Sequence, residues 1–142
     1  MKSVFNILEF LGYEVKISNS PELIRKASHL ILPGVGAFGS AMERIRDRIP
    51  LRVLEEEVFE NQKPFLGICV GMQVLASSGM EFGFNEGLGW IPGKVVKLDT
   101  KNLPSLHIGW NDIKIKRDFP LFSGLSDIKD FYFVHSFVFD EE

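Results

Sequence analysis

The cysteine of this 142-residue chain, Cys69, lies between two glycines in the sequence GICVG, residues 67–71. An apolar run, Phe65–Ile68, precedes it, and a helix is expected to start at Val70. This order of strand, tight turn and helix is typical of a nucleophile elbow, where larger flanking side chains would collide with neighbouring backbone. A helix that begins beside a thiol also favours the thiolate. The pattern therefore predicts that Cys69 is a nucleophile rather than a buried structural thiol.

A second glycine-containing turn, PGVG at residues 33–36, follows a short apolar strand expected at His29–Leu32. Its glycines allow backbone N–H groups to turn toward a ligand, and an oxyanion hole needs such donors beside the nucleophile. Taken alone, these four residues are more typical of an ordinary turn at the end of a strand. Together with Cys69, they predict a site for acyl transfer.

A cysteine nucleophile usually requires a base, and the sequence offers His29, His107 and His135. His29 opens a strand and is expected at an edge or on the surface. His135 is the preferred base on chemical grounds, although a histidine on an apolar strand is more often a hydrogen-bonded core or pocket residue. The histidines and the cysteine lack the spacing of metal ligands, so we expect no metal and no other cofactor.

The elements expected in the first half of the chain alternate between helices and strands. Helical spacing or start signals predict helices at 4–11, 21–27, 41–48, 51–61 and 70–78. Strands are predicted at 14–18, 29–32 and 65–68. This alternation favours a mostly parallel sheet flanked by helices, with functional loops at the carboxyl ends of the strands. Both PGVG and Cys69 fall at such ends.

The second half of the chain has a different pattern. We expect a loop over Met80–Gly93 and then short strands, at 94–98, 106–108, 112–116 and 130–138. These strands would add antiparallel or mixed pairing to the parallel sheet. Because the sequence shows no repeat and no clear linker, residues 1–142 are interpreted as one domain of the α/β class.

Composition limits the classes of partner. The formal net charge of −3 argues against nucleic acid as a main partner. A single cysteine excludes a disulfide framework within the chain and is typical of a reducing cytosol. Since the sequence has no apolar run long enough to cross a bilayer, we expect a cytoplasmic protein that does not bind membranes.

Four segments, in this order and spacing, resemble the class I glutamine amidotransferases. They are ILPGVGAFGSAM, PFLGICVGMQVL, HIGWND and YFVHSF. The Gly-x-Cys-x-Gly-x-Gln motif marks the class, whereas PGVGAFG and GWN narrow the resemblance to the glutaminase subunits of imidazole glycerol phosphate synthase. The resemblance covers essentially the whole chain and implies a mostly parallel sheet with flavodoxin-like layering.

The resemblance implies the chemistry of the site. Cys69 would attack the side-chain amide of glutamine, form a γ-glutamyl thioester and release ammonia, after which water would free glutamate. The backbone around Val35 and Gly36 would complete the oxyanion hole after a rearrangement. The residues implied to surround the glutamine are Gly34, Val35, Gly36, Gln73, His135 and Ser136.

The resemblance also implies a partner. Ammonia would pass into a cyclase subunit, a (β/α)₈ barrel in a heterodimer, that makes imidazole glycerol phosphate for histidine biosynthesis. Trp110 and Asn111 match positions at that interface. Close relatives that supply ammonia for the amidination of surface sugars carry the same motifs, so this second pathway stays open as an alternative.

The sequence departs from the family pattern in three places. Phe137 stands where the family usually has tyrosine, and no histidine is followed by x-Glu, the motif that holds the family's base and its orienting carboxylate. The family also begins with a strand ahead of the first helix expected here. We expect the chain to be a fragment of a longer protein. Two alternatives are a non-catalytic homologue that binds a partner and a protein in which His135 has become the base.

Overall fold

The computed structural model describes residues 2–101, 106–117, 119–124 and 130–140. They group into two compact units, one formed by Met1–Val96 with Phe139–Glu142 and the other by Lys97–Val138. The assignment of residues 1–142 to a single domain therefore stays a prediction. None of the helices in the described ranges is sufficiently long and apolar to span a membrane.

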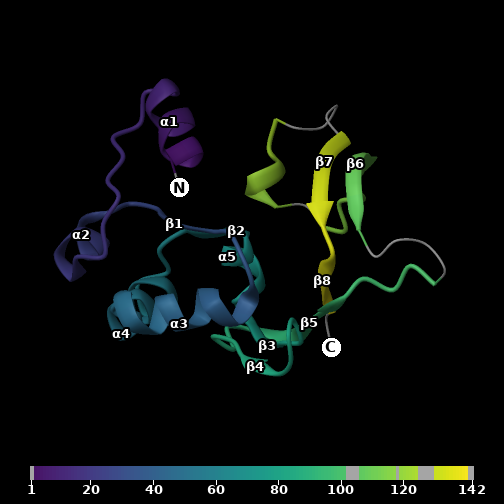
Figure 1. Cartoon of the computed structure of the whole chain (residues 1–142). Helices are drawn as coiled ribbons and strands as arrows, with labels where there is room; N and C mark the ends of the chain where they lie inside the picture. The colour runs from purple at the N-terminus through teal and green to yellow at the C-terminus, as the bar shows by residue number, and fades with distance from the viewer. Residues whose placement is uncertain (1, 102–105, 118, 125–129, 141–142) are drawn as a thin grey trace. The chain divides into compact units, whose positions relative to one another are not determined.

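Helices make up much of the first unit, and Figure 1 labels the α-helices along the chain. They are α1 (Lys2–Phe10), α2 (Pro21–Lys26), α3 (Phe38–Arg48), α4 (Leu51–Glu55), a π-helical turn (Glu56–Glu60) and α5 (Val70–Gln73). Proline occupies the first turn of α2, where its missing N–H costs no hydrogen bond. Two arginines in the last turn of α3 complement the negative end of that helix.

The first unit contains a parallel strand pair. Strand β1 (Leu30–Gly34) pairs along its whole length with β2 (Phe65–Cys69), from the partners Leu30 and Phe65 to the partners Gly34 and Cys69. Helix α3 follows β1 and α5 follows β2. The parallel pairing and the α/β class are as the sequence predicted.

A second sheet in this unit has the strand order β4-β3-β5-β8. Its strands are β3 (Ala76–Gly79), β4 (Asn85–Glu86), β5 (Ile91–Lys97) and β8 (Phe137–Asp140), of which β8 belongs to this unit from Phe139 on. β3 pairs in parallel with β5 and antiparallel with β4. The most deeply buried large side chains of the described residues are Phe38, Met42, Val74 and Val95.

The structure corrects three elements predicted for this unit, the first being the loop expected over Met80–Gly93, which contains β4 and the start of β5. Residues 14–18 form no strand, although their polar and apolar residues alternate. The helix after Cys69 ends at Gln73 instead of near residue 78, because the chain turns and enters β3 at Ala76. Ala76 is fully buried, so burial against a neighbouring strand overrides local helix preference there.

A buried ion pair joins the π-helical turn to Lys63, beside the carboxyl end of α2. The Lys63 ammonium contacts the Glu57 carboxylate, and both side chains are at least nine-tenths buried. Lys63 Nζ also donates to the carbonyl oxygens of Ile24 at 2.9 Å and Arg25 at 2.8 Å, at the carboxyl end of α2. The hydrogen bond from Lys63, aided by one from Asn61, lowers the pKa of Glu57 although burial opposes this shift.

The second unit contains an antiparallel strand pair and a short helical turn. Strands β6 (His107–Asp112) and β7 (Asp130–His135) pair along their whole length, and a 3₁₀ turn covers Pro120–Phe122. The sequence predicted strands at 106–108 and 112–116, whereas β6 is continuous from His107 to Asp112 and residues 113–116 form no strand. It also predicted one strand over 130–138, which the structure divides at Ser136 into β7 and β8.

Candidate active site

Cys69 is the last residue of β2 and stands directly before α5. Its backbone has φ 56° and ψ −123°, a conformation that residues with a side chain seldom adopt. The thiol is exposed. A strained backbone that presents an accessible nucleophile between a strand and a helix is the geometry predicted from the GICVG sequence. Because α5 has only one turn, its dipole is smaller than that of the longer helix we expected.

Glycines allow the backbone to pass close to itself around Cys69. A Cβ on Gly67 would lie 2.6 Å from the carbonyl oxygen of Gly71, and a Cβ on Gly34 would lie 2.7 Å from the Gly71 nitrogen. A Cβ on Gly71 would overlap the carbonyl oxygen of Leu32. Each of these neighbouring atoms belongs to the backbone, so no side-chain rotation can relieve the contact. The glycines on both sides of Cys69 are therefore required by steric contact, as the sequence indicated.

The PGVG segment ends beside Cys69. Gly34 is the register partner of Cys69, so the carboxyl ends of β1 and β2 meet at this edge. Val35 is 76% exposed, and Gly36 has φ 96°, which favours glycine. The structure thus brings the predicted donor segment and the predicted nucleophile together. The rearranged state in which Val35 and Gly36 would donate stays a prediction.

Gln73 is the last residue of α5, one helical turn after Cys69, and is half-buried. Its place beside the elbow is compatible with the predicted contact to a substrate, which stays a prediction.

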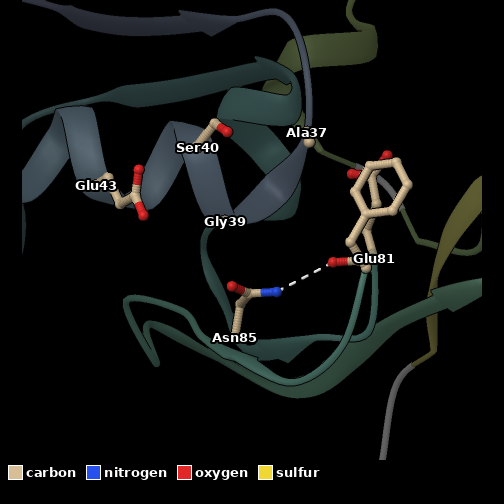
Figure 2. A pocket seen from close by; sticks show the side chains of 7 residues that line it. Ala37, Gly39, Ser40, Glu43, Glu81 and Asn85 are labelled. Atoms are coloured by element: carbon tan, nitrogen blue, oxygen red, sulfur yellow. Dashed lines mark hydrogen bonds between the residues drawn. The ribbon is translucent and has the colours of Figure 1, made fainter.

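A cavity of about 180 Å³ lies where the segment after Gly36 enters α3. Its lining residues, shown in Figure 2, are Ala37, Gly39, Ser40, Glu43, Glu81, Phe82 and Asn85. The Glu81 carboxylate accepts a hydrogen bond from the Phe38 N–H at 2.8 Å. The side chain of Asn85 donates to the Glu81 carbonyl oxygen at 3.1 Å. Two carboxylates in one cavity make it suitable for a cationic group.

The sequence did not identify this cavity. Residues 80–93 were expected to form a loop, and Glu81 stood out by no motif. Its hydrogen bond joins residues 43 positions apart in the chain. Only the tertiary fold brings them together, so no local pattern could have pointed to Glu81.

His135 and Ser136, predicted to lie beside glutamine, belong to the second unit. Nε2 of His135 lies 2.9 Å from Nδ1 of His107, and Nδ1 of His135 lies 3.0 Å from the Phe137 carbonyl oxygen. The Ser136 carbonyl oxygen accepts from the Leu98 N–H at 2.8 Å. The structure therefore joins two of the three candidate bases to each other. The third, His29, contacts Ser28.

Trp110 and Asn111 were predicted to share a partner interface, and β6 turns them to opposite faces. Trp110 is 74% exposed and contacts Tyr132 edge to face, with ring centroids 5.7 Å apart. Ile108 and Val134, also exposed, continue this apolar face by register. Asn111 contacts Nε2 of His107 on the other face, at 3.4 Å. The apolar face fits a protein contact, and the interface itself stays a prediction.

A metal centre finds no support among the residues that the structure describes. Within those ranges, no three side chains of histidine, cysteine, aspartate or glutamate cluster in a way that could hold an ion.

Comparison with known proteins gives a family match over residues 2–142, to the family described as glutamine amidotransferase class-I. A curated relative in Vibrio vulnificus, imidazole glycerol phosphate synthase subunit HisH 2, is 46% identical over 96% of this chain and 64% of its own length. The HisH subunit of Methanosarcina barkeri is 48% identical over 99% of this chain and 68% of its own. HisH 1 of Campylobacter jejuni is 43% identical over 96% of this chain and 69% of its own length. The chain thus spans about two thirds of the length of these relatives.

Proposed function

Because this chain belongs to the class-I glutamine amidotransferase family, we propose that it forms the glutaminase part of an imidazole glycerol phosphate synthase. The reaction would convert glutamine and water to glutamate and ammonia. The observation that carries this proposal is the pairing of Gly34 with Cys69, which sets a glycine-containing backbone segment beside an exposed, strained cysteine.

The proposed chemistry begins at the sulfur atom. Once its proton has passed to a base, Cys69 Sγ attacks the side-chain carbonyl carbon of glutamine, and the carbonyl oxygen gains negative charge. Backbone N–H groups of Val35 and Gly36 would stabilise this oxyanion, since such donors are most effective where charge develops. The base then returns this proton to the amide nitrogen as the C–N bond breaks, so ammonia leaves and a thioester forms. Water hydrolyses the thioester and restores the thiol.

The cavity at the start of α3 supplies a further part of the proposal. Glutamine carries an ammonium group on its α-carbon, and the carboxylates of Glu43 and Glu81 line a cavity next to Ala37, the residue after Gly36. Glu81 is held in place by the Phe38 N–H. We assign the binding of the substrate ammonium to this cavity, with Glu81 as the principal partner.

The fate of ammonia follows from the relatives. Each of the relatives named above is a HisH subunit of imidazole glycerol phosphate synthase, which supports this pathway over the amidination of surface sugars. The proposed partner is a cyclase subunit with a (β/α)₈ barrel, in a cytoplasmic heterodimer. The exposed face of β6 and β7 around Trp110 and Tyr132 is the proposed contribution of this chain to the contact.

A glutamine analogue that alkylates activated cysteines tests the nucleophile. We expect it to label the complete enzyme at Cys69 and to be blocked by an excess of glutamine. Peptide mass spectrometry would identify the labelled residue. Equal labelling with and without glutamine would contradict a glutamine site at Cys69.

A further inference from the structure

Two histidines of the second unit face each other across β6 and β7. His107 and His135 are register partners, and Nδ1 of His107 lies 2.9 Å from Nε2 of His135. In a hydrogen bond between two imidazole rings, one nitrogen donates and the other accepts. The neighbours of the two rings decide which nitrogen carries the hydrogen.

The neighbours at both ends of the pair require the same direction of the hydrogen bond between the rings, with His107 as donor and His135 as acceptor. At one end, Nδ1 of His135 contacts the Phe137 carbonyl oxygen, which can only accept, so this Nδ1 carries hydrogen and Nε2 is the acceptor. At the other end, the Asp112 N–H donates to Oδ1 of Asn111 at 3.0 Å, which directs the amide nitrogen of Asn111 to Nε2 of His107. That nitrogen of His107 therefore accepts, and its Nδ1 donates to His135.

We propose that His107 is a positioning residue that holds His135 in the Nδ1–H tautomer and thereby fixes the backbone at Phe137. The ring of His107 is itself held by Phe133, which stacks on it at 4.7 Å between centroids and 16° between planes. The Leu98 N–H fixes the preceding carbonyl, that of Ser136. Two successive carbonyl groups of the segment 135–137 are thus held by separate donors.

This arrangement determines what His135 can do. A neutral imidazole accepts a proton at its one unprotonated nitrogen, and in His135 that nitrogen already accepts from His107. His135 therefore holds the segment 135–137 in place through its hydrogen bond to Phe137. To act as a base for Cys69, it would first have to lose its hydrogen bond with His107. This catalytic consequence rests on the proposed function, whereas the tautomer assignment does not.

Nitrogen NMR of the full chain with ¹⁵N-labelled imidazole rings tests the assignment directly. We expect His107 and His135 both in the Nδ1–H form, with a scalar coupling between Nδ1 of His107 and Nε2 of His135. The exposed His29, outside this network, serves as the internal control and should show the averaged signals of a ring in free exchange. An Nε2–H form of either His107 or His135, or signals that match those of His29, would overturn the proposal.

Two substitutions separate positioning from a merely structural role. His107→Phe keeps an aromatic ring against Phe133 but removes the donor to Nε2 of His135, so the Nδ1–H signal of His135 should exchange faster. His107→Asn keeps an N–H close to the position of Nδ1 and should restore the slower exchange. An unchanged His135 signal in His107→Phe would contradict the proposal.

The same pair of variants, made in the complete enzyme, tests the catalytic consequence. His107→Phe should raise the KM for glutamine about tenfold, the equivalent of one lost hydrogen bond, with kcat little changed. His107→Asn should recover most of this loss, and His29→Gln should behave as the unmodified enzyme. If the unmodified enzyme had no glutaminase activity, the proposed function would be refuted. The NMR result would still decide the tautomer. An unchanged KM in His107→Phe would refute the positioning role of His107 but not the proposed glutaminase function.

Discussion

Gly34 and Cys69 are register partners at the carboxyl ends of β1 and β2. The relationship depends on the absence of side chains, because a Cβ on Gly34 would lie 2.7 Å from the Gly71 nitrogen of the turn that carries the thiol. One strand end therefore places the backbone of the PGVG segment next to the strand end that carries Cys69. The proposed acyl transfer requires these two parts to lie side by side.

Gly71→Ala should destabilise the protein strongly. The new methyl group would overlap the carbonyl oxygen of Leu32, and backbone must move to relieve the overlap, so we expect a loss of about 2–4 kcal/mol in the free energy of unfolding. Denaturant unfolding followed by circular dichroism measures this loss. Gly12→Ala is the control, since Gly12 has φ 85° with no atom near the new methyl, and its cost should be about 1 kcal/mol. Equal losses would show that steric contact at the elbow is unimportant.

Stability should depend on pH through Glu57. Its pKa is lowered in the folded state, chiefly by the hydrogen bond from Lys63, so the unfolded chain binds the proton more tightly. The stabilisation is then complete above the ordinary pKa of a glutamate and is lost as pH falls through the lowered value. Thermal unfolding between about pH 7 and pH 3 measures the effect. Glu57→Gln should reduce the slope in the acidic range, and an unchanged slope would refute the assignment.

Glu81→Gln should weaken glutamine binding. The amide can still accept from the Phe38 N–H, but it cannot balance the charge of the substrate ammonium, so we expect KM for glutamine to rise about tenfold or more. Steady-state glutaminase kinetics of the complete enzyme measure this change. Glu9→Gln, an exposed residue of α1, is the matched control and should leave KM unchanged. A KM equal to that of the control would remove Glu81 from the substrate site.

Trp110→Ala should weaken the proposed association with the cyclase. Exposed tryptophan side chains at the centre of an interface often contribute about 2 kcal/mol or more, which corresponds to roughly a 30-fold increase in Kd. Titration calorimetry with the purified partner measures this change. Phe10→Ala, which removes an 84% exposed aromatic side chain from α1, is the control. Similar affinities for both variants would place the interface elsewhere.

The elbow and its partner segment were predictable because their signals are local. Glycines at 67 and 71 around a cysteine, with apolar residues before them, specify a tight turn by steric exclusion alone. The PGVG segment is similarly local, and its position beside Cys69 follows from the pairing of consecutive parallel strands.

The features that the sequence did not predict depend on distant contacts. The strand at Ala76–Gly79 replaces an expected helix because these residues pair with β4 and β5. β6 continues through Gly109, where a break was expected, because every residue of β6 has a partner in β7. The contact between His107 and His135 joins residues 28 positions apart. Such pairings are decided by the tertiary fold, and a single sequence does not reveal them.

The most direct test of the account is the source of nitrogen used by the complete enzyme when Cys69 is replaced by alanine. Synthesis of imidazole glycerol phosphate should then stop with glutamine as the nitrogen donor and continue with added ammonium salts at the rate of the unmodified enzyme. This result would show that Cys69 serves only to release ammonia. A glutamine-dependent rate that survives Cys69→Ala would contradict the central claim.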